Sequence, residues 1–334
     1  MNARLLLAAA ILASSQIQAQ THVQTSDAYR ISGPQSYENL TIFPIHGHGH
    51  PGRKLITLQE ALAEHKVVVY ETQSVNELAI ANVSDDDDVF ISSGDIVKGG
   101  QQDRTMKDDF ILPSKSGKVL VSAFCVEHGR WTRRGDEPIN VFNGSNDMVA
   151  TKALKMAVRE QANQSEVWNQ VAQAQAKLSS ATGAPARAAV SPSSMQMTLE
   201  TPAVLRSTEA YINALSKAAT DPDVVGYAFA INGRMNSAEV YASHDLFIRL
   251  WPKLLKSAAV EAVSEYHPGA AAHFTAATRQ DAQSLLKDGP GAGSSRQLNA
   301  RTKVESKDTP ASTIFQTRDQ ASGTWVHMSY IAKY

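Results

Sequence analysis

The order of strand-forming and helix-forming segments constrains the fold of this chain more than any other feature. The first third carries short β-branched and aromatic runs bounded by turn residues, at 40–45, 67–71, 78–83, 89–92, 110–112 and 119–126. Apolar residues at helical spacing occupy 146–179, 208–219 and 245–265. Further strand patterns occur at 224–231, 235–241, 312–317 and 325–331. Because strands come from both chain ends around a helical middle, we expect one α+β domain over 38–331, with a mostly antiparallel β-sheet packed against the helices.

Two short signals predict how single elements begin and turn. Thr57 followed three residues later by Glu60 is typical of a capping box, which would open a short helix. Asn232-Gly233 between two apolar runs predicts a tight hairpin turn, because both residues tolerate the left-handed backbone that such a turn requires.

Three further patterns predict strand pairing and mobility. The runs 78–83 and 89–92, separated by turn residues, predict a second hairpin. Pro44 suits an edge strand, since proline has no N–H to donate to a neighbouring strand. Residues 180–197 are rich in alanine, serine and proline, which predicts a mobile loop.

The beginning of the sequence has the three-part order of a secretory signal peptide. A short basic start up to Arg4 precedes an apolar run at 5–13, and a polar stretch of small residues then ends at Ala19. The apolar run is much shorter than the roughly 20 residues of a membrane-spanning helix. We therefore expect residues 1–19 to be removed, leaving a polar tail at 20–37 and a periplasmic or secreted chain without a membrane anchor. A buried amino-terminal helix is the alternative.

Composition excludes several classes of protein. A single cysteine rules out an internal disulfide, so stability must come from packing, for which a hydrophobic content of 43% is sufficient. A net charge of −1 with dispersed basic residues argues against a nucleic-acid partner. Motifs for serine hydrolases, phosphate loops, dinucleotide binding and zinc proteases are absent from the sequence. We expect no cofactor, and a small molecule or an envelope protein as partner.

Two motifs in the first half occur together in one protein family. Residues 94–104 have the sequence GDIVKGGQQDR, and residues 125–131 have the sequence CVEHGRW. With the Asn232-Gly233 turn and the segment LWPKLL at 250–255, they resemble the bacterial "ARG and rhodanese-phosphatase-superfamily-associated" protein domain family over residues 38–331. That family has no known activity, so the resemblance implies no reaction and no catalytic residues. Members often have glutamine where this chain has His128.

The two motifs supply the candidate site. Its members are the polar and aromatic side chains near the motif glycines, namely Asp95, Gln102, Arg104, Glu127, His128, Arg130 and Trp131. We expect segments 99–104 and 127–131 to meet, with Arg104 or Arg130 hydrogen-bonded to Glu127 or Asp95. Three roles fit this cluster: a buried network that fixes strand register, a pocket whose arginines bind a small anion, and acid–base catalysis by Asp95 and Glu127.

Cys125 and His128 raise the question of a thiol nucleophile, because an imidazolium stabilises a thiolate. Cys125, however, alternates with Val119, Val121 and Ala123 on one face of the expected strand, where cysteine usually serves as a small apolar residue. The negative charge of the nearby Glu127 would also raise the thiol pKa. A structural cysteine is therefore favoured.

Alternating histidines give a weak metal candidate. His46, His48 and His50 would share one face of an extended strand, and imidazole is a good ligand for Zn²⁺, Cu²⁺ and Ni²⁺. No acidic residue or cysteine nearby completes a site, and the following Pro51-Gly52 favours a solvated loop. We expect no functional metal here.

The sequence thus predicts an exported binding or interaction module whose ligand is unknown. The alternative is an enzyme that uses Glu127, His128, Arg104 and Arg130. An open pocket in which these groups converge would favour a ligand or a reaction, whereas a closed ion-pair network would favour a structural role.

Overall fold

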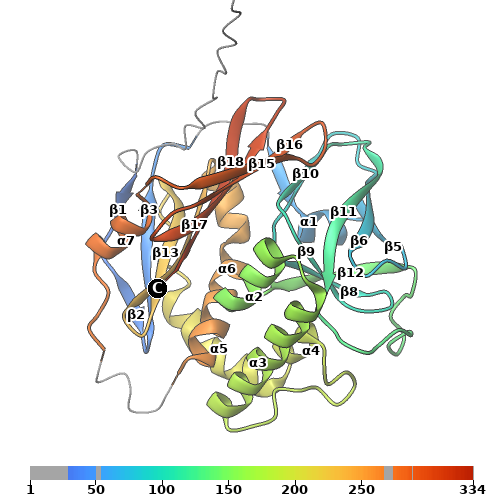
Figure 1. Ribbon diagram of the computed structural model, residues 1–334, viewed down its shortest axis with the longest axis horizontal. Coiled ribbons are helices and arrows are strands. Elements are labelled where there is room, and N and C mark those ends of the chain that lie inside the picture. Colours follow the sequence, from blue (N-terminus) through green and yellow to red (C-terminus); the bar gives the residue numbers. More distant parts are fainter. Residues whose placement is uncertain (1–28, 50–53, 267–273, 288, 334) are drawn as a thin grey trace, which may run out of the picture.

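The computed structural model describes residues 29–49, 54–266, 274–287 and 289–333, so the expected signal peptide and His50 lie outside the described residues. The chain has an α+β fold in which antiparallel sheet dominates. Helix α6 (His244–Ser264) lies between a large open sheet and a closed barrel and contacts both (Figure 1).

Strands from both ends of the chain build the large sheet, as the sequence predicted. Its nine strands, all antiparallel to their neighbours, are β1 (Arg30–Ile31), β3 (Leu40–His46), β13 (Val224–Ile231), β14 (Arg234–Tyr241), β18 (Thr324–Ala332), β17 (Ser312–Asp319), β16 (Thr302–Asp308) and β15 (Ala292–Gln297) in order, with β2 (Gln35–Tyr37) beside β3. The β3–β13 pair therefore joins the first and last thirds of the chain.

Six further strands form a closed barrel, which the sequence patterns did not predict. Its strands in order are β11 (Gly117–Cys125), β6 (Glu77–Asn82), β5 (Val67–Glu71), β12 (Val141–Met148), β8 (Asp95–Gly99) and β9 (Arg104–Met106). A small sheet of β10 (Phe110–Leu112), β7 (Asp88–Ile91) and β4 (Leu55–Thr57) lies beside it, with β4 and β7 parallel. Closure of the barrel leaves it no unpaired strand edge.

Helices cover both faces of the large sheet. On the inner face the apolar side chains of α6 pack against Tyr227 and Phe229 of β13. The other inner helices are α2 (Lys152–Met156), the π-helix η2 (Ala157–Gln161), α3 (Gln164–Thr182), α4 (Met195–Leu199) and α5 (Pro202–Leu215), and α1 (Leu58–Ala63) covers the barrel. On the outer face α7 (Arg279–Leu285) buries Ala282 and Leu285 against the sheet. Strands β3 and β13 are buried along their whole length, which explains their apolar sequences, whereas β15 at the far edge of the sheet is exposed.

Two local predictions are confirmed by the backbone and its hydrogen bonds. Thr57 and Glu60 form a capping box at the start of α1, with Thr57 N donating to Glu60 Oε2 at 2.8 Å. Asn232 and Gly233 have φ angles of 49° and 73°, as the tight turn between β13 and β14 requires.

Two predictions of strand pairing are wrong. Strands β6 and β7 do not form a hairpin, because β6 pairs within the barrel and β7 pairs with β10 and β4. Asn82 redirects the chain between them, donating to the carbonyl oxygens of Asp87 at 2.7 Å and Leu112 at 3.2 Å. Strand β3 is also not an edge strand. Pro44 is tolerated there because β1 and β2 pair with opposite ends of β3 and leave Pro44 between them.

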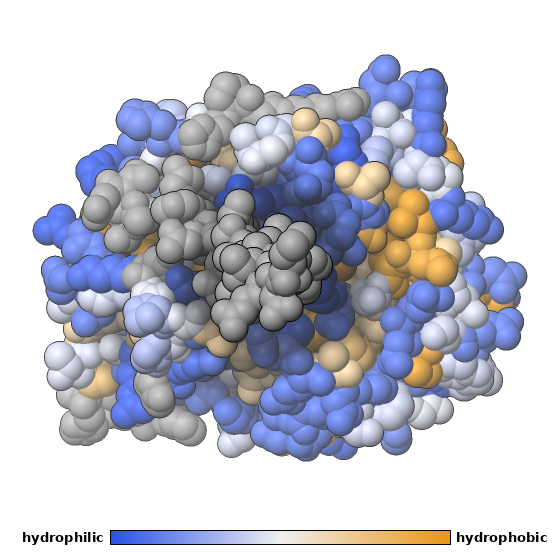
Figure 2. Space-filling model, turned by 45° about the horizontal axis from the view of Figure 1, so that its top comes forward, coloured by the Kyte–Doolittle hydropathy of each residue, from blue (hydrophilic) through white to orange (hydrophobic). Residues whose placement is uncertain are grey.

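The surface is mostly hydrophilic, with apolar patches on the side of the barrel (Figure 2). Val83 directly follows barrel strand β6, and Leu120 lies on barrel strand β11. Both are among the most exposed large apolar side chains. Within the described residues no helix combines the length and apolar character that crossing a membrane would demand.

Candidate functional site

The two sequence motifs meet in space and form a closed ionic cluster. We call Asp103, Glu127, Arg130 and Arg134 the motif cluster. Arg130 Nε donates to Glu127 Oε1 at 2.7 Å, one of the arginine–carboxylate pairs expected from the sequence, and its Nη1 and Nη2 donate to the carbonyl oxygens of Gly100 and Gly99 at 3.0 Å, which joins the two segments. Arg134, which the sequence analysis did not select, donates to both carboxylate oxygens of Asp103 at 2.8 Å and to Glu127 Oε1 at 3.2 Å. Both carboxylates are fully buried.

Two serines complete the motif cluster from the loop before α4. Ser194 Oγ donates to Asp103 Oδ2 at 2.7 Å, and Ser191 Oγ donates to Glu127 Oε1. The backbone N–H of Asp103 donates to Glu127 Oε2 at 2.9 Å. Every oxygen of the two carboxylates therefore has a donor. Part of the loop that the sequence predicted to be mobile is tied to the barrel by these bonds, and its mobility stays a prediction.

The electrostatics of the motif cluster favour its charged form. Burial raises the pKa of Glu127, but hydrogen bonds from Arg130, Ser191 and the Asp103 N–H outweigh burial and hold that pKa below its usual value. Burial likewise lowers the pKa of Arg134, and the Asp103 carboxylate reverses this effect. Glu127 is therefore held in its charged form beside the two guanidinium groups.

Arg104 forms a separate buried pair. Its Nη2 lies 3.4 Å from each carboxylate oxygen of Glu71, and its Nη1 donates to the carbonyl oxygen of Gln102 at 2.8 Å. The guanidinium carbon lies 5.9 Å from the ring centre of Trp131, whose side chain is 45% exposed. Arg104 therefore makes neither of its expected pairs, with Asp95 or with Glu127. It pairs with Glu71 of β5 instead.

Asp95 and His128 lie apart from the motif cluster. The carboxylate of Asp95 is paired with the ammonium group of Lys253, which fastens barrel strand β8 to α6. The His128 ring packs edge-on against Trp168 of α3, with 4.4 Å between ring centres. Asp95 and Glu127 therefore do not face a common space, and the geometry offers no acid–base pair from these two residues.

Cys125 is fully buried at the end of β11. Burial raises the pKa of its thiol to about 11. Its Sγ contacts the carbonyl oxygen of Val75 at 3.6 Å. A thiol with so high a pKa is protonated at neutral pH, so the contacts favour the structural role.

The alternating histidines do not converge in the described structure. His46 Nδ1 lies 2.8 Å from Asp223 Oδ1, whereas His48 is exposed. Within the described ranges no three side chains of histidine, cysteine, aspartate or glutamate are placed to hold a metal ion.

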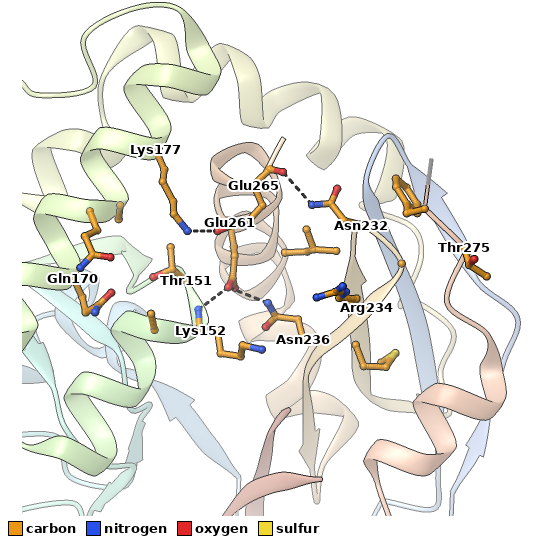
Figure 3. A pocket seen from close by; sticks show the side chains of 17 residues that line it. Thr151, Lys152, Gln170, Lys177, Asn232, Arg234, Asn236, Glu261, Glu265 and Thr275 are labelled. Atoms are coloured by element: carbon orange, nitrogen blue, oxygen red, sulfur yellow. Dashed lines mark hydrogen bonds and ion pairs between the residues drawn. The ribbon is translucent and has the colours of Figure 1, made fainter. Parts of the chain in front are cut away.

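An open cleft lies elsewhere, between α3, α6 and the β13–β14 hairpin (Figure 3). Its volume is about 900 Å³, and we call it the Glu261 cleft. Its polar lining comprises Thr151, Lys152, Gln170, Gln173, Lys177, Asn232, Arg234, Asn236, Glu261, Glu265 and Thr275, and its larger apolar residues are Ile231, Met235 and Phe274. Pockets of this size are typical of small-molecule sites.

Glu261 at the floor of this cleft has an incomplete set of hydrogen bonds. The residue is 4% exposed, and its Oε1 accepts from Lys152 N at 2.6 Å and from Asn236 Nδ2 at 2.9 Å. Its Oε2 has no hydrogen-bond partner in the described part of the chain. Buried carboxylate oxygens almost always have a donor, so this oxygen marks a position that a donor from outside can fill.

The backbone next to Glu261 is strained. Thr151, the N-cap of α2, has a φ of 66°, which is rare and costly for a β-branched residue. This conformation accompanies the bond from the next N–H, that of Lys152, to Glu261. Strained residues persist where their surroundings fix them, and they cluster at functional sites.

The charges of the cleft are only partly paired. Lys177 Nζ contacts Glu265 Oε1 at 2.5 Å across the cleft mouth. The side chains of Lys152 and Arg234 form no ion pair with the residues that the structure describes. Figure 3 shows Arg234 on the hairpin side of the cleft and Glu261 on the α6 side. Among the described residues, the cleft therefore combines two cations without a carboxylate partner and one carboxylate oxygen without a donor.

The sequence of the chain matches one described protein family. A family model described as "ARG and Rhodanese-Phosphatase-superfamily-associated Protein domain" matches residues 28–331, nearly the whole chain. The chain belongs to this family. No curated protein and no solved structure matches the chain. Both the motif cluster and the Glu261 cleft lie inside the family domain, whose description states an association and names no reaction.

The site residues predicted from the sequence of this ARG and Rhodanese-Phosphatase-superfamily-associated domain do not include Asp103, Arg134 and Glu261. Asp103 lies inside the first motif, between the predicted residues Gln102 and Arg104. Arg134 follows the second motif in an irregular loop, where no periodicity distinguishes it from its neighbour Arg133. Glu261 did have a signal, because it continues the buried stripe of α6 through Leu250 and Leu254. A carboxylate on an apolar helix face calls for a buried partner or a ligand.

A second buried cluster of charges joins the large sheet of the family domain to the loop before β10. His327 Nδ1 lies 2.8 Å from Asp109 Oδ2, and His327 Nε2 lies 3.0 Å from Glu239 Oε2. Burial lowers the pKa of His327, but the two carboxylates outweigh burial and raise it to about 9. His327 therefore carries a positive charge at neutral pH and bridges the two carboxylates.

Proposed function

We propose that this protein is an exported binding module whose recognition site is the Glu261 cleft. The observation that carries the proposal is Glu261 Oε2, a buried oxygen of a residue that lines the cleft, which receives no hydrogen bond from the residues that the structure describes. A ligand with an ammonium or hydroxyl group would supply that donor. The four amide side chains of the lining offer both donors and acceptors to the rest of a polar ligand.

The motif cluster supports this proposal as a structural frame. Its carboxylates are saturated by protein donors, so a ligand would have to break an existing ion pair to bind there. The cluster joins β8–β9 of the barrel to the loop that leads into α4, and α4 packs beside α3. Helix α3 in turn forms one wall of the Glu261 cleft. The two family motifs would then hold the cleft wall in place.

An enzyme that uses Glu127, His128, Arg104 and Arg130 remains the alternative, but no contact favours it. Arg104 and Arg130 each have protein acceptors, and His128 is engaged with Trp168. These four groups do not face one cavity.

Export is supported by the sequence alone. The basic start, the short apolar run and the small residue at Ala19 together favour release of a periplasmic or secreted protein.

The proposal is tested by native mass spectrometry of protein purified from the exported fraction. We expect wild-type protein to retain a bound polar small molecule, and Glu261→Gln to lose it while melting at a similar temperature. Glu209→Gln is the matched control, because Glu209 is an exposed glutamate on α5 outside the cleft lining. A ligand retained equally by wild type and Glu261→Gln would contradict the proposal.

A further inference from the structure

We infer that the ligand of the Glu261 cleft is a short peptide with a free amino terminus and an acidic side chain. This inference rests on the proposed function, because it assumes that the cleft binds a ligand. Three features of the lining carry it: the free carboxylate oxygen, the set of amide side chains, and the two unpaired cations.

The amino terminus is assigned to Glu261. Its Oε1 is fixed by Lys152 N and Asn236 Nδ2, so the side chain is held in one orientation and only Oε2 is left for a ligand. A primary ammonium group fits this oxygen better than a hydroxyl does, because a hydrogen bond between two charged groups is roughly twice as strong as a neutral one. The positive charge of a protonated amino terminus would also compensate the buried charge of the carboxylate.

The amide side chains suit a peptide backbone. Asn232 and Asn236 come from the hairpin, and Gln170 and Gln173 come from α3 on the opposite wall. Each amide offers donors and an acceptor, and a peptide backbone presents donors and acceptors in alternation. Each of the four already donates one hydrogen bond within the protein, to the Glu265 carbonyl, Glu261, Glu166 and Asn169 respectively, so a peptide backbone would meet the N–H and carbonyl groups that are left.

The unpaired cations account for the acidic side chain. Lys152 and Arg234 have no carboxylate partner in the part of the chain that the structure describes, whereas Lys177 is already paired with Glu265. The cleft lining carries three basic and two acidic side chains, so an ammonium ligand alone would face a net positive charge. A peptide that brings both an ammonium group and a carboxylate complements both parts of the cleft.

The size of the cleft separates a peptide from a free amino acid. Its volume of about 900 Å³ lies near the upper end of the range for ligand pockets, roughly 300–1,000 Å³. A single amino acid would leave most of this space empty. The apolar side chains of Ile231, Met235 and Phe274 would cover side chains of a peptide of a few residues.

The test uses the full exported chain and three pools of tetrapeptide amides with randomised sequences. The first pool has free amino termini and one aspartate or glutamate per peptide. The second pool is the same but N-acetylated, and the third has asparagine or glutamine in place of the acid. Adducts are counted by native mass spectrometry, and the peptides found are then titrated individually by fluorescence anisotropy.

We expect the first pool to bind, and the other two to bind at least about tenfold more weakly, the effect of one charge-assisted hydrogen bond. Glu261→Gln should abolish the preference for free over acetylated termini, and Lys152→Met/Arg234→Met should abolish the preference for the acid. Glu209→Gln should keep both preferences. If Glu261→Gln does not fold, the acetylated pool and the double variant, whose side chains are not buried, still decide the question.

Equal binding of free and acetylated peptides, or no adduct from any pool, would overturn the inference. The proposed function fails separately. If the natively retained molecule depends on Glu261 but is not displaced by any peptide, the cleft is a binding site and only the peptide assignment is wrong.

Discussion

Replacing Glu127 with glutamine tests whether the motif cluster is a structural frame. The side chain is fully buried, and its Oε1 receives hydrogen bonds from Arg130, Arg134 and Ser191. Glutamine removes the charge but keeps the volume, so both guanidinium groups lose part of their compensation. Breaking a buried ion pair in this way costs about 3–5 kcal/mol.

The expected change in melting temperature follows from the size of the chain. With an unfolding entropy of about 2.1 cal/mol/K per residue, one kcal/mol shifts the Tm of a domain of about 300 residues by roughly 1.6 °C, so Glu127→Gln should lower the Tm by roughly 5–8 °C. Differential scanning calorimetry measures this shift. Asp136→Asn is the control, because the Asp136 carboxylate is fully exposed and lies 3.8 Å from Arg133 in a surface pair.

Two outcomes for Glu127→Gln distinguish a binding site from a structural frame. If Glu127→Gln melts together with Asp136→Asn and the wild type but loses a natively retained ligand, the motif cluster is a binding site. If it melts at a lower temperature and keeps the ligand once folded, the structural assignment holds.

Three further predictions follow from other parts of the molecule. Folding raises the pKa of His327 from 6.5 to about 9, so the stability that it contributes with Asp109 and Glu239 should be fully present below about pH 6.5 and be lost as the pH rises through about 9. Chemical denaturation from pH 6 to 10 measures the free energy of unfolding, and His327→Gln should make its dependence on pH flatter. Cys125 should react slowly with maleimide in the native state and quickly after unfolding, and Cys125→Ala should cost about 1 kcal/mol; fast native labelling would contradict its burial. The exported protein should begin at Gln20, and amino-terminal sequencing that finds Met1 on it would refute cleavage.

Elements were predictable from sequence where local chemistry decides the outcome. The Asn232-Gly233 turn and the Thr57 capping box depend on neighbouring residues alone. The expected helix at 146–179 was correct only in part, because β12 extends to Met148 and the helical stretch is interrupted by η2. Periodicity detects buried faces but does not distinguish a continuous helix from two helices joined by a π-turn.

Pairing partners were not predictable, because they depend on contacts between distant segments. The strands 78–83 and 89–92 were located correctly but assigned to each other, whereas Asn82 sends the chain from the barrel to the small sheet. The contact between segments 99–104 and 127–131 was predicted because both segments have glycines beside charged residues. The Glu261 cleft combines α3, α6 and a hairpin, and no sequence motif links these three elements.

The pairing of β3 with the distant β13 would affect how an exported chain reaches its fold. Strand β3 pairs with β13, so Leu40 must find Ile231 across more than half of the sequence. If the chain crosses the membrane from its amino terminus, β3 would emerge early, as an apolar strand whose main partner has not yet arrived. We expect refolding to be slow, and aggregation of the half-emerged chain to be the principal hazard. A periplasmic holdase that covers residues 40–46 until β13 arrives would then raise the yield of folded protein.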